Sequence, residues 1–163
     1  MFALAACSAS PRDPISNSQP TADRLPIEIK MTRTMCFGTC PAYTVVIHGD
    51  GRIDWQGEEY VSVKGVAHAM ISGDQLAAIS AELDKVAFFT LAEDGSPPSD
   101  ACKHGHACVK VICTDTSHTR LDVTRGKQHH AIDDAHCTGL AVEAVEVLID
   151  KLTNTERWIG KGH

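Results

Sequence analysis

The sequence predicts an α+β fold, in which a curved antiparallel sheet of about five to six strands carries two helices on one face. Three observations lead to this prediction. Short runs that alternate apolar and polar residues lie on both sides of a stretch with helical spacing, and a second helical stretch follows near the end. The runs are joined by short turns, which favour antiparallel pairing. A length of 163 residues with 43% hydrophobic content is typical of one globular domain.

The first expected strands form a hairpin in the first third of the chain. Residues 27–31 alternate, and residues 43–48 do so again after a loop over 36–41. Gly49-Asp50-Gly51 predicts a tight turn, and residues 52–55 return along the preceding strand. The residues expected on the buried face of this hairpin are Tyr43, Val45, Ile47, Ile53 and Trp55.

A further strand over residues 61–68 and a helix over 73–87 are expected next. Gly65 interrupts the alternation of the strand, which suggests a bulge. Ser72 and Gln75 have the spacing of a capping box, which predicts where the helix starts. The apolar stripe expected to face the core is Leu76, Ile79, Leu83 and Val86. Phe88, Phe89 and Leu91, which follow the helix, are also expected to pack into the core.

The second half of the chain is less regular. Residues 93–107 contain two prolines and two glycines and predict a long loop. A strand over 108–113 is expected to pair with a strand over 119–123, and residues 128–137 are expected to form a His-rich loop.

A second helix is expected over residues 140–152. Its predicted core face consists of Val142, Val145, Ile149 and Leu152. A short turn over 157–159, packed by its tryptophan, is expected to end the domain.

The N-terminus predicts export and a lipid anchor. Leu4-Ala5-Ala6-Cys7 resembles a bacterial lipobox, so residues 1–7 are interpreted as the remnant of a lipoprotein signal peptide, with Cys7 as the lipidated residue. Residues 8–26 are rich in Ser, Pro, Asn and Thr and are expected to form a flexible tether. Residues 27–160 are then expected to form a single α+β domain, with the chain attached to the membrane through its lipid.

The seven cysteines support the same interpretation. Setting Cys7 aside for lipid leaves six, an even number that is typical of disulfides in an oxidising compartment. The disulfide candidates are Cys36, Cys40, Cys102, Cys108, Cys113 and Cys137. Cys36 and Cys40 are expected to clamp a loop. Bridges Cys102–Cys108 and Cys113–Cys137 are one possibility, and other pairings among these four stay open.

Metal binding or thiol redox chemistry is the alternative for the His- and Cys-rich segments. Zinc and copper prefer cysteine and histidine ligands. The candidate ligands are Cys102, His104, His106, Cys108, His136 and Cys137. Their spacing matches no defined zinc finger, and Cys36 and Cys40 are separated by three residues instead of the two usual in redox motifs. The first expectation is therefore that the protein has no cofactor.

Several functional classes are disfavoured by composition and motif. The net charge is −6, with 15 basic and 21 acidic residues and no basic cluster, so nucleic-acid binding is not expected. No Gly-x-Ser-x-Gly elbow is present. Asp133, Asp134 and His136 are of the types used for acid–base chemistry, but such residues near a helix start are more often caps and solvated groups. The chain is thus expected to be non-enzymatic, with no catalytic residues.

The segment Cys36-Phe37-Gly38-Thr39-Cys40-Pro41-Ala42-Tyr43, with the turn at Asp50-Gly51, resembles an uncharacterised bacterial family of exported or lipid-anchored domains. Members carry a Cys-Phe-Gly-x-Cys-Pro-x-Tyr motif at the opening of a hairpin. The resemblance covers roughly residues 27–160 and implies a fold but no reaction. Residues 100–137, which hold the extra cysteines and several histidines, depart from the family pattern.

The function expected from sequence is that of a cell-envelope lipoprotein with a disulfide-stabilised binding domain. Its partner would be another envelope protein or the cell wall, and it would lie at the outer membrane, facing the periplasm. Ser8 after Cys7 is consistent with that location, since an Asp at this position usually marks retention.

Overall fold

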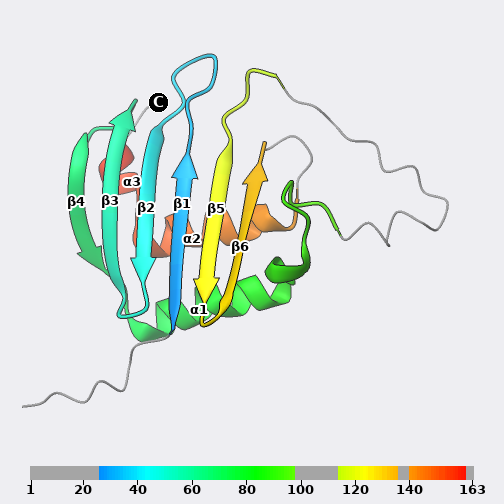
Figure 1. Cartoon of the computed structure of the whole chain (residues 1–163). Helices are drawn as coiled ribbons and strands as arrows, with labels where there is room; N and C mark the ends of the chain where they lie inside the picture. The colour runs from blue at the N-terminus through cyan, green and yellow to red at the C-terminus, as the bar shows by residue number, and fades with distance from the viewer. Residues whose placement is uncertain (1–25, 98–113, 136–139, 161–163) are drawn as a thin grey trace, which may run out of the picture.

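The computed structural model describes residues 26–97, 114–135 and 140–160, and within them it has the expected α+β architecture (Figure 1). Six strands form one antiparallel sheet in the order β4-β3-β2-β1-β5-β6. They are β1 (Ile27–Arg33), β2 (Ala42–His48), β3 (Arg52–Glu59), β4 (Gly65–Met70), β5 (Thr119–Arg125) and β6 (Gln128–Asp134). The helical segments are α1 (Gly73–Lys85), a 3₁₀ turn η1 (Phe88–Thr90), α2 (Val142–Thr153) and α3 (Glu156–Ile159).

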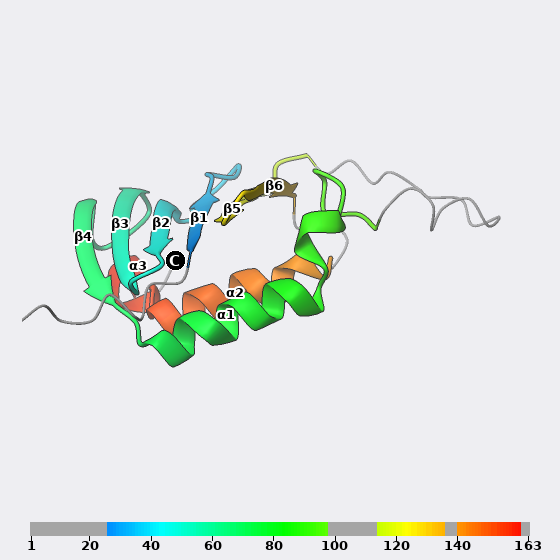
Figure 2. The same ribbon diagram turned by 60° about the horizontal axis from the view of Figure 1, so that its bottom comes forward.

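Helices α1 and α2 lie side by side across one face of the sheet (Figure 2). The alternating strands bury one set of side chains against these helices, as the period of two requires. Ile29, Met31, Val45 and Ile47 are fully buried, and so are Leu76, Ile79 and Leu83 of α1 and Val145 and Ile149 of α2. No described element covers the opposite face of the sheet. The core therefore lies in a single layer between sheet and helices.

Three aromatic side chains, from β2, β3 and α3, pack against one another in the core. The ring centroids of Tyr43 and Trp55 are 4.6 Å apart, and those of Trp55 and Trp158 are 5.0 Å apart. The indole nitrogen of Trp55 donates to the carbonyl oxygen of Val63 at 3.0 Å. A Cβ at Gly57 would collide with that same carbonyl oxygen, so glycine is required at this position. The packing of the terminal tryptophan agrees with the expectation from sequence.

Two expectations about the second half of the sheet are wrong. Residues 128–134 form strand β6 instead of a His-rich loop. Both edges of β5 are occupied, by β1 and β6, so the expected pairing of residues 119–123 with residues 108–113 does not occur. Residues 108–113 themselves lie outside the described part of the chain.

The fourth strand starts later than expected, at Gly65 instead of residue 61. The backbone N–H groups of Ser62 and Val63 donate to the carbonyl oxygens of Ile159 and Trp158, both at 2.9 Å. The side chain of Val61 is buried in the core. Contact with α3 thus replaces pairing with β3 over these residues.

Candidate functional site

The β1–β2 loop, residues 34–41, is closed by a disulfide between Cys36 and Cys40, whose Cα atoms are 5.6 Å apart. Its base is tied to the segment that precedes β5. The N–H of Thr34 donates to the carbonyl oxygen of His118 at 2.9 Å, and the N–H of His118 donates to Oγ1 of Thr34 at 2.9 Å. The loop is therefore closed by its own disulfide and hydrogen-bonded to the segment that precedes β5.

This loop exposes apolar side chains. The side chain of Phe37 is 90% exposed and that of Met35 is 57% exposed. No Lys, Arg, Asp, Glu or His occurs over residues 34–41. Large apolar side chains at a fixed, uncharged protrusion are typical of a contact surface.

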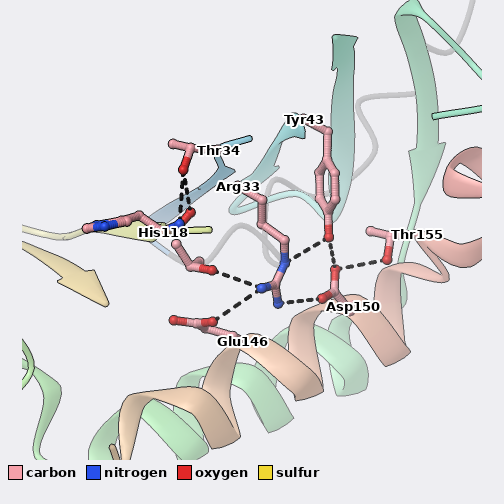
Figure 3. A network of polar contacts seen from close by, with 8 residues as sticks. Arg33, Thr34, Tyr43, His118, Glu146, Asp150 and Thr155 are labelled. Atoms are coloured by element: carbon pink, nitrogen blue, oxygen red, sulfur yellow. Dashed lines mark hydrogen bonds and ion pairs between the residues drawn. The ribbon is translucent and has the colours of Figure 1, made fainter. Parts of the chain in front are cut away.

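A polar network lies directly beneath the loop, where β1, β2, β5 and α2 meet (Figure 3). The guanidinium of Arg33 donates from Nη2 to Oδ2 of Asp150 at 2.8 Å, from Nη1 to Oγ1 of Thr119 at 2.9 Å, and from Nε to Oη of Tyr43 at 3.0 Å. Oδ1 of Asp150 accepts the hydroxyls of Tyr43 at 2.8 Å and Thr155 at 2.9 Å. One arginine therefore joins the strands that flank the loop to the helix layer.

Glu146 of α2 completes this network. Its side chain is 1% exposed, and its Oε2 lies 3.6 Å from Nη1 of Arg33. Burial raises the pKa of Glu146 to about 8, an effect that Arg33 opposes and Asp134 reinforces. Burial, with help from Asp150, also raises the pKa of Tyr43 above its ordinary value. The phenol therefore stays protonated at neutral pH and serves as a hydrogen-bond donor.

The uncovered face of the sheet carries a second set of polar contacts, between histidines and carboxylates. Asp54 lies 2.7 Å from Nε2 of His48 and 2.9 Å from Nδ1 of His68. The hydrogen bond to His48 is the main reason that the pKa of Asp54 lies below its ordinary range. Similar contacts of 2.9 Å join His129 to Asp122 and His118 to Asp133.

The sequence placed His48, Asp54 and His68 in expected strands but gave no register between those strands, and it assigned His129 to a loop, so these histidine–carboxylate pairs were not predicted. The available signal was positional, since His48, Asp54 and His68 occupy directly paired or adjacent outward positions on β2, β3 and β4. Within the three described ranges, no group of three His, Cys, Asp or Glu residues is placed to hold a metal ion. A shallow depression of about 280 Å³ lies at the opposite end of the sheet from the β1–β2 loop, beside Glu28 and His48.

Only part of the predicted site lies in the described residues. The bridge between Cys36 and Cys40 is present. Cys7, Cys102, His104, His106, Cys108, Cys113, His136 and Cys137 lie outside the described residues. Asp133 is exposed and Asp134 is buried, because neighbouring residues on a strand point to opposite faces of the sheet. None of the helices that the structure describes has the length and apolar character needed to cross a membrane.

Comparison with known proteins gives one family. A family model described as "Domain of unknown function (DUF6438)" matches residues 27–154, which include all six strands and the whole of α1 and α2. No curated protein matches the chain.

Proposed function

Because the chain belongs to the DUF6438 family, whose function is unknown, we propose a function from its own site: a binding module of the cell envelope that contacts a protein partner through the β1–β2 loop. The observation that carries the proposal is the 90% exposure of Phe37 inside a disulfide-closed loop. The Cys-Phe-Gly-x-Cys-Pro-x-Tyr segment is then a recognition element as well as the opening of a hairpin.

The loop has the properties of a preorganised contact. Burying a phenylalanine side chain stabilises an interface by about 1.5–3 kcal/mol, and aromatic residues recur among those that dominate binding energy. A loop already closed by a bridge loses less conformational entropy on binding than an open one does. The bonds between Thr34 and His118, and the Arg33 network below them, hold its base in place. The contact surface is therefore rigid before the partner arrives.

The chemistry of the loop suggests what the partner offers. Met35 and Phe37 project from a segment without charged residues. Such a protrusion fits an apolar cleft with backbone groups at its rim, whereas a highly charged surface would lose solvation without gaining ion pairs. We therefore propose a partner protein with an apolar cleft.

The envelope location is part of the same proposal. It is supported by the lipobox-like sequence that ends at Cys7 and by the tether-like composition of residues 8–26. A disulfide between Cys36 and Cys40 is of the kind that persists outside the reducing cytosol. We place the protein at the outer membrane, facing the periplasm, with binding and not catalysis as its activity.

Site-specific photo-crosslinking in intact cells tests the proposed contact. A photoreactive amino acid in place of Phe37 should yield one discrete protein adduct. The same substitution at Val147, which is 64% exposed on α2, should not yield that adduct. Replacing both Cys36 and Cys40 by Ser should weaken the adduct at position 37, because the free loop is less organised. Equal adducts at positions 37 and 147, or none at 37, would contradict the proposal.

A further inference from the structure

The two edges of the sheet differ in how they are protected. The edge formed by β6 carries Asp133 and Asp134, and the N–H of Asp133 donates to the carbonyl oxygen of Glu93 at 2.8 Å, so part of this edge is covered. Strand β4 forms the other edge, and no described segment pairs with its outer side. Natural sheets usually block a free edge with charged residues, proline or a covering segment. Over its six residues β4 has no Lys, Arg, Asp, Glu or Pro.

The side chains of β4 are arranged symmetrically about its centre. Val66 and Met70 are each 66% exposed, and the side chain of His68, midway between them, is 65% exposed. All three lie on the uncovered face of the sheet, where residues two apart point the same way. If two β4 strands run antiparallel about a two-fold axis at His68, each Val66 faces Met70 of the other copy. The exposed side chains of β4 therefore match those of a second, antiparallel β4.

The charges that flank β4 favour the same arrangement. Lys64 precedes the strand and Asp74 follows it, in the first turn of α1. Antiparallel pairing places Lys64 of each copy opposite Ser72 of the other, at the end where Asp74 follows, whereas parallel in-register pairing would set the two Lys64 side chains together. Lys64 also contacts Glu59 of its own copy at 2.8 Å, so its charge is partly balanced before pairing.

We propose that β4 is a dimerisation edge, at which two copies of the chain pair antiparallel and join their sheets into one. This contact is separate from the proposed binding loop, because β4 ends the sheet while the loop joins the interior strands β1 and β2. A dimer therefore presents two copies of Phe37 and leaves both free. A stable interface usually buries about 1,600 Å² in total, more than one short strand supplies, so monomer and dimer should be in equilibrium.

Sedimentation equilibrium of the full chain over a wide concentration range tests the proposal. The wild type should show a reversible dimer. Val66→Lys should weaken association at least about tenfold, because lysine on an edge strand opposes pairing. Val147→Lys is the matched control, since this valine is 64% exposed on α2, and it should leave association unchanged. Val66 is exposed, and a thermal melt confirms that the variant is folded.

Disulfide trapping tests the register. Residues directly opposite in an antiparallel pair have Cα atoms about 4.5–5.5 Å apart, within the range that a disulfide spans. His68→Cys should therefore crosslink to itself between copies under mild oxidation. Trypsin releases position 68 in the peptide 65–85, which contains no native cysteine, so mass spectrometry identifies the bridge without ambiguity. Ala77→Cys, exposed on α1 in the same peptide, should not form this bridge.

Three results would overturn the proposal. One is a monomer up to roughly 1 mM, where a contact of about 4 kcal/mol is half formed. Another is a dimer that Val66→Lys and Val147→Lys affect equally. The third is an equal yield of crosslink at positions 68 and 77. None of these results depends on the Phe37 loop, so failure here leaves the proposed function to its own test.

Discussion

At the scale of single residues, the most consequential group is the carboxyl of Glu146. It belongs to α2, lies 3.6 Å from the guanidinium of Arg33 and is almost without solvent contact. Removing a carboxylate from water disfavours its charged form, and one arginine at 3.6 Å only partly compensates. A group of this kind links the stability of the fold to pH.

The prediction concerns Glu146→Gln. The folded pKa of about 8 lies above 4.5, the ordinary pKa of a glutamate side chain. The folded state therefore binds the proton more tightly. The stability from this group is complete below about pH 4.5 and is lost as the pH rises towards 8. Gln keeps the shape without the charge, so the variant should lose less stability than the wild type between pH 5 and pH 8. The difference should be on the order of 1–3 kcal/mol, measured by urea unfolding at both pH values.

Glu143→Gln is the control for this measurement. Glu143 lies one turn earlier on α2 and is only partly buried. Its replacement removes a carboxyl from the same helix and gives the baseline against which the pH dependence of Glu146→Gln is compared. If Glu146→Gln and the wild type lose stability in parallel as the pH rises, the carboxyl of Glu146 is charged throughout and the assigned pKa is wrong.

At the scale of elements, helix α1 is defined by its N-terminal cap. The N–H of Gln75 donates to Oγ of Ser72 at 3.2 Å, and the N–H of Ser72 donates to Oε1 of Gln75 at 2.9 Å. The same glutamine also donates from Nε2 to the carbonyl oxygen of Leu152 at 3.4 Å, near the end of α2. The cap thus stabilises one helix and contacts the other.

Ser72→Ala should destabilise the protein by about 1 kcal/mol, because the N–H of Gln75 loses its acceptor. Thermal unfolding followed by circular dichroism measures the change. Ser62→Ala, at an exposed serine of the β3–β4 loop, should have little effect. Equal destabilisation by the two substitutions would show that the loss comes from the serine side chain in general and not from the cap.

Strand β6 shows why one element escaped prediction. The adjacent pairs His129-His130 and Asp133-Asp134 place polar residues on both faces, so the alternation that marks a strand is absent. The strand forms because β5 offers a free edge and because Ile132 is buried in the core. His130 packs its ring against Phe88 at 5.4 Å. Strand β5 is joined to β6 by the short turn at Gly126-Lys127, but Phe88 is remote in sequence, so the local pattern contains only part of the reason that the strand forms.

At the scale of the whole molecule, the cysteines separate the proposed scaffold from the metal-binding or redox alternative. Cys36 and Cys40 are bridged, and Cys102, Cys108, Cys113 and Cys137 lie outside the described residues. In an oxidising compartment these four are expected to be bridged as well. In the alternative, some of them would stay reduced and hold zinc or copper.

Protein purified from cells without reductant should therefore have no free thiol among the six cysteines and no stoichiometric metal. Thiol titration after denaturation, with elemental analysis of the same sample, measures both quantities. The intact mass should show a lipidated N-terminus at Cys7. Free thiols with bound zinc or copper would instead support the alternative, and six free thiols with an unlipidated N-terminus would contradict the envelope proposal.

The elements that sequence predicted well share a local cause. The capping box at Ser72, the apolar stripe of α1 and the alternation of residues 43–48 are each contained in a few consecutive residues. The polar network could not be predicted in the same way. Arg33 and Asp150 are separated by 117 positions, and nothing near either residue indicates the other.

The fold class, the main helices, the turn at Asp50-Gly51 and most of the residues that face the core could be predicted from local sequence, because period and capping are properties of neighbouring residues. The order of the strands, with β1 between β2 and β5, follows from the folded arrangement, because pairing depends on which distant edges meet. That arrangement alone exposed Phe37 and left β4 as a free edge. Exposure and free edges are set by what the remainder of the chain leaves uncovered, which no local pattern contains.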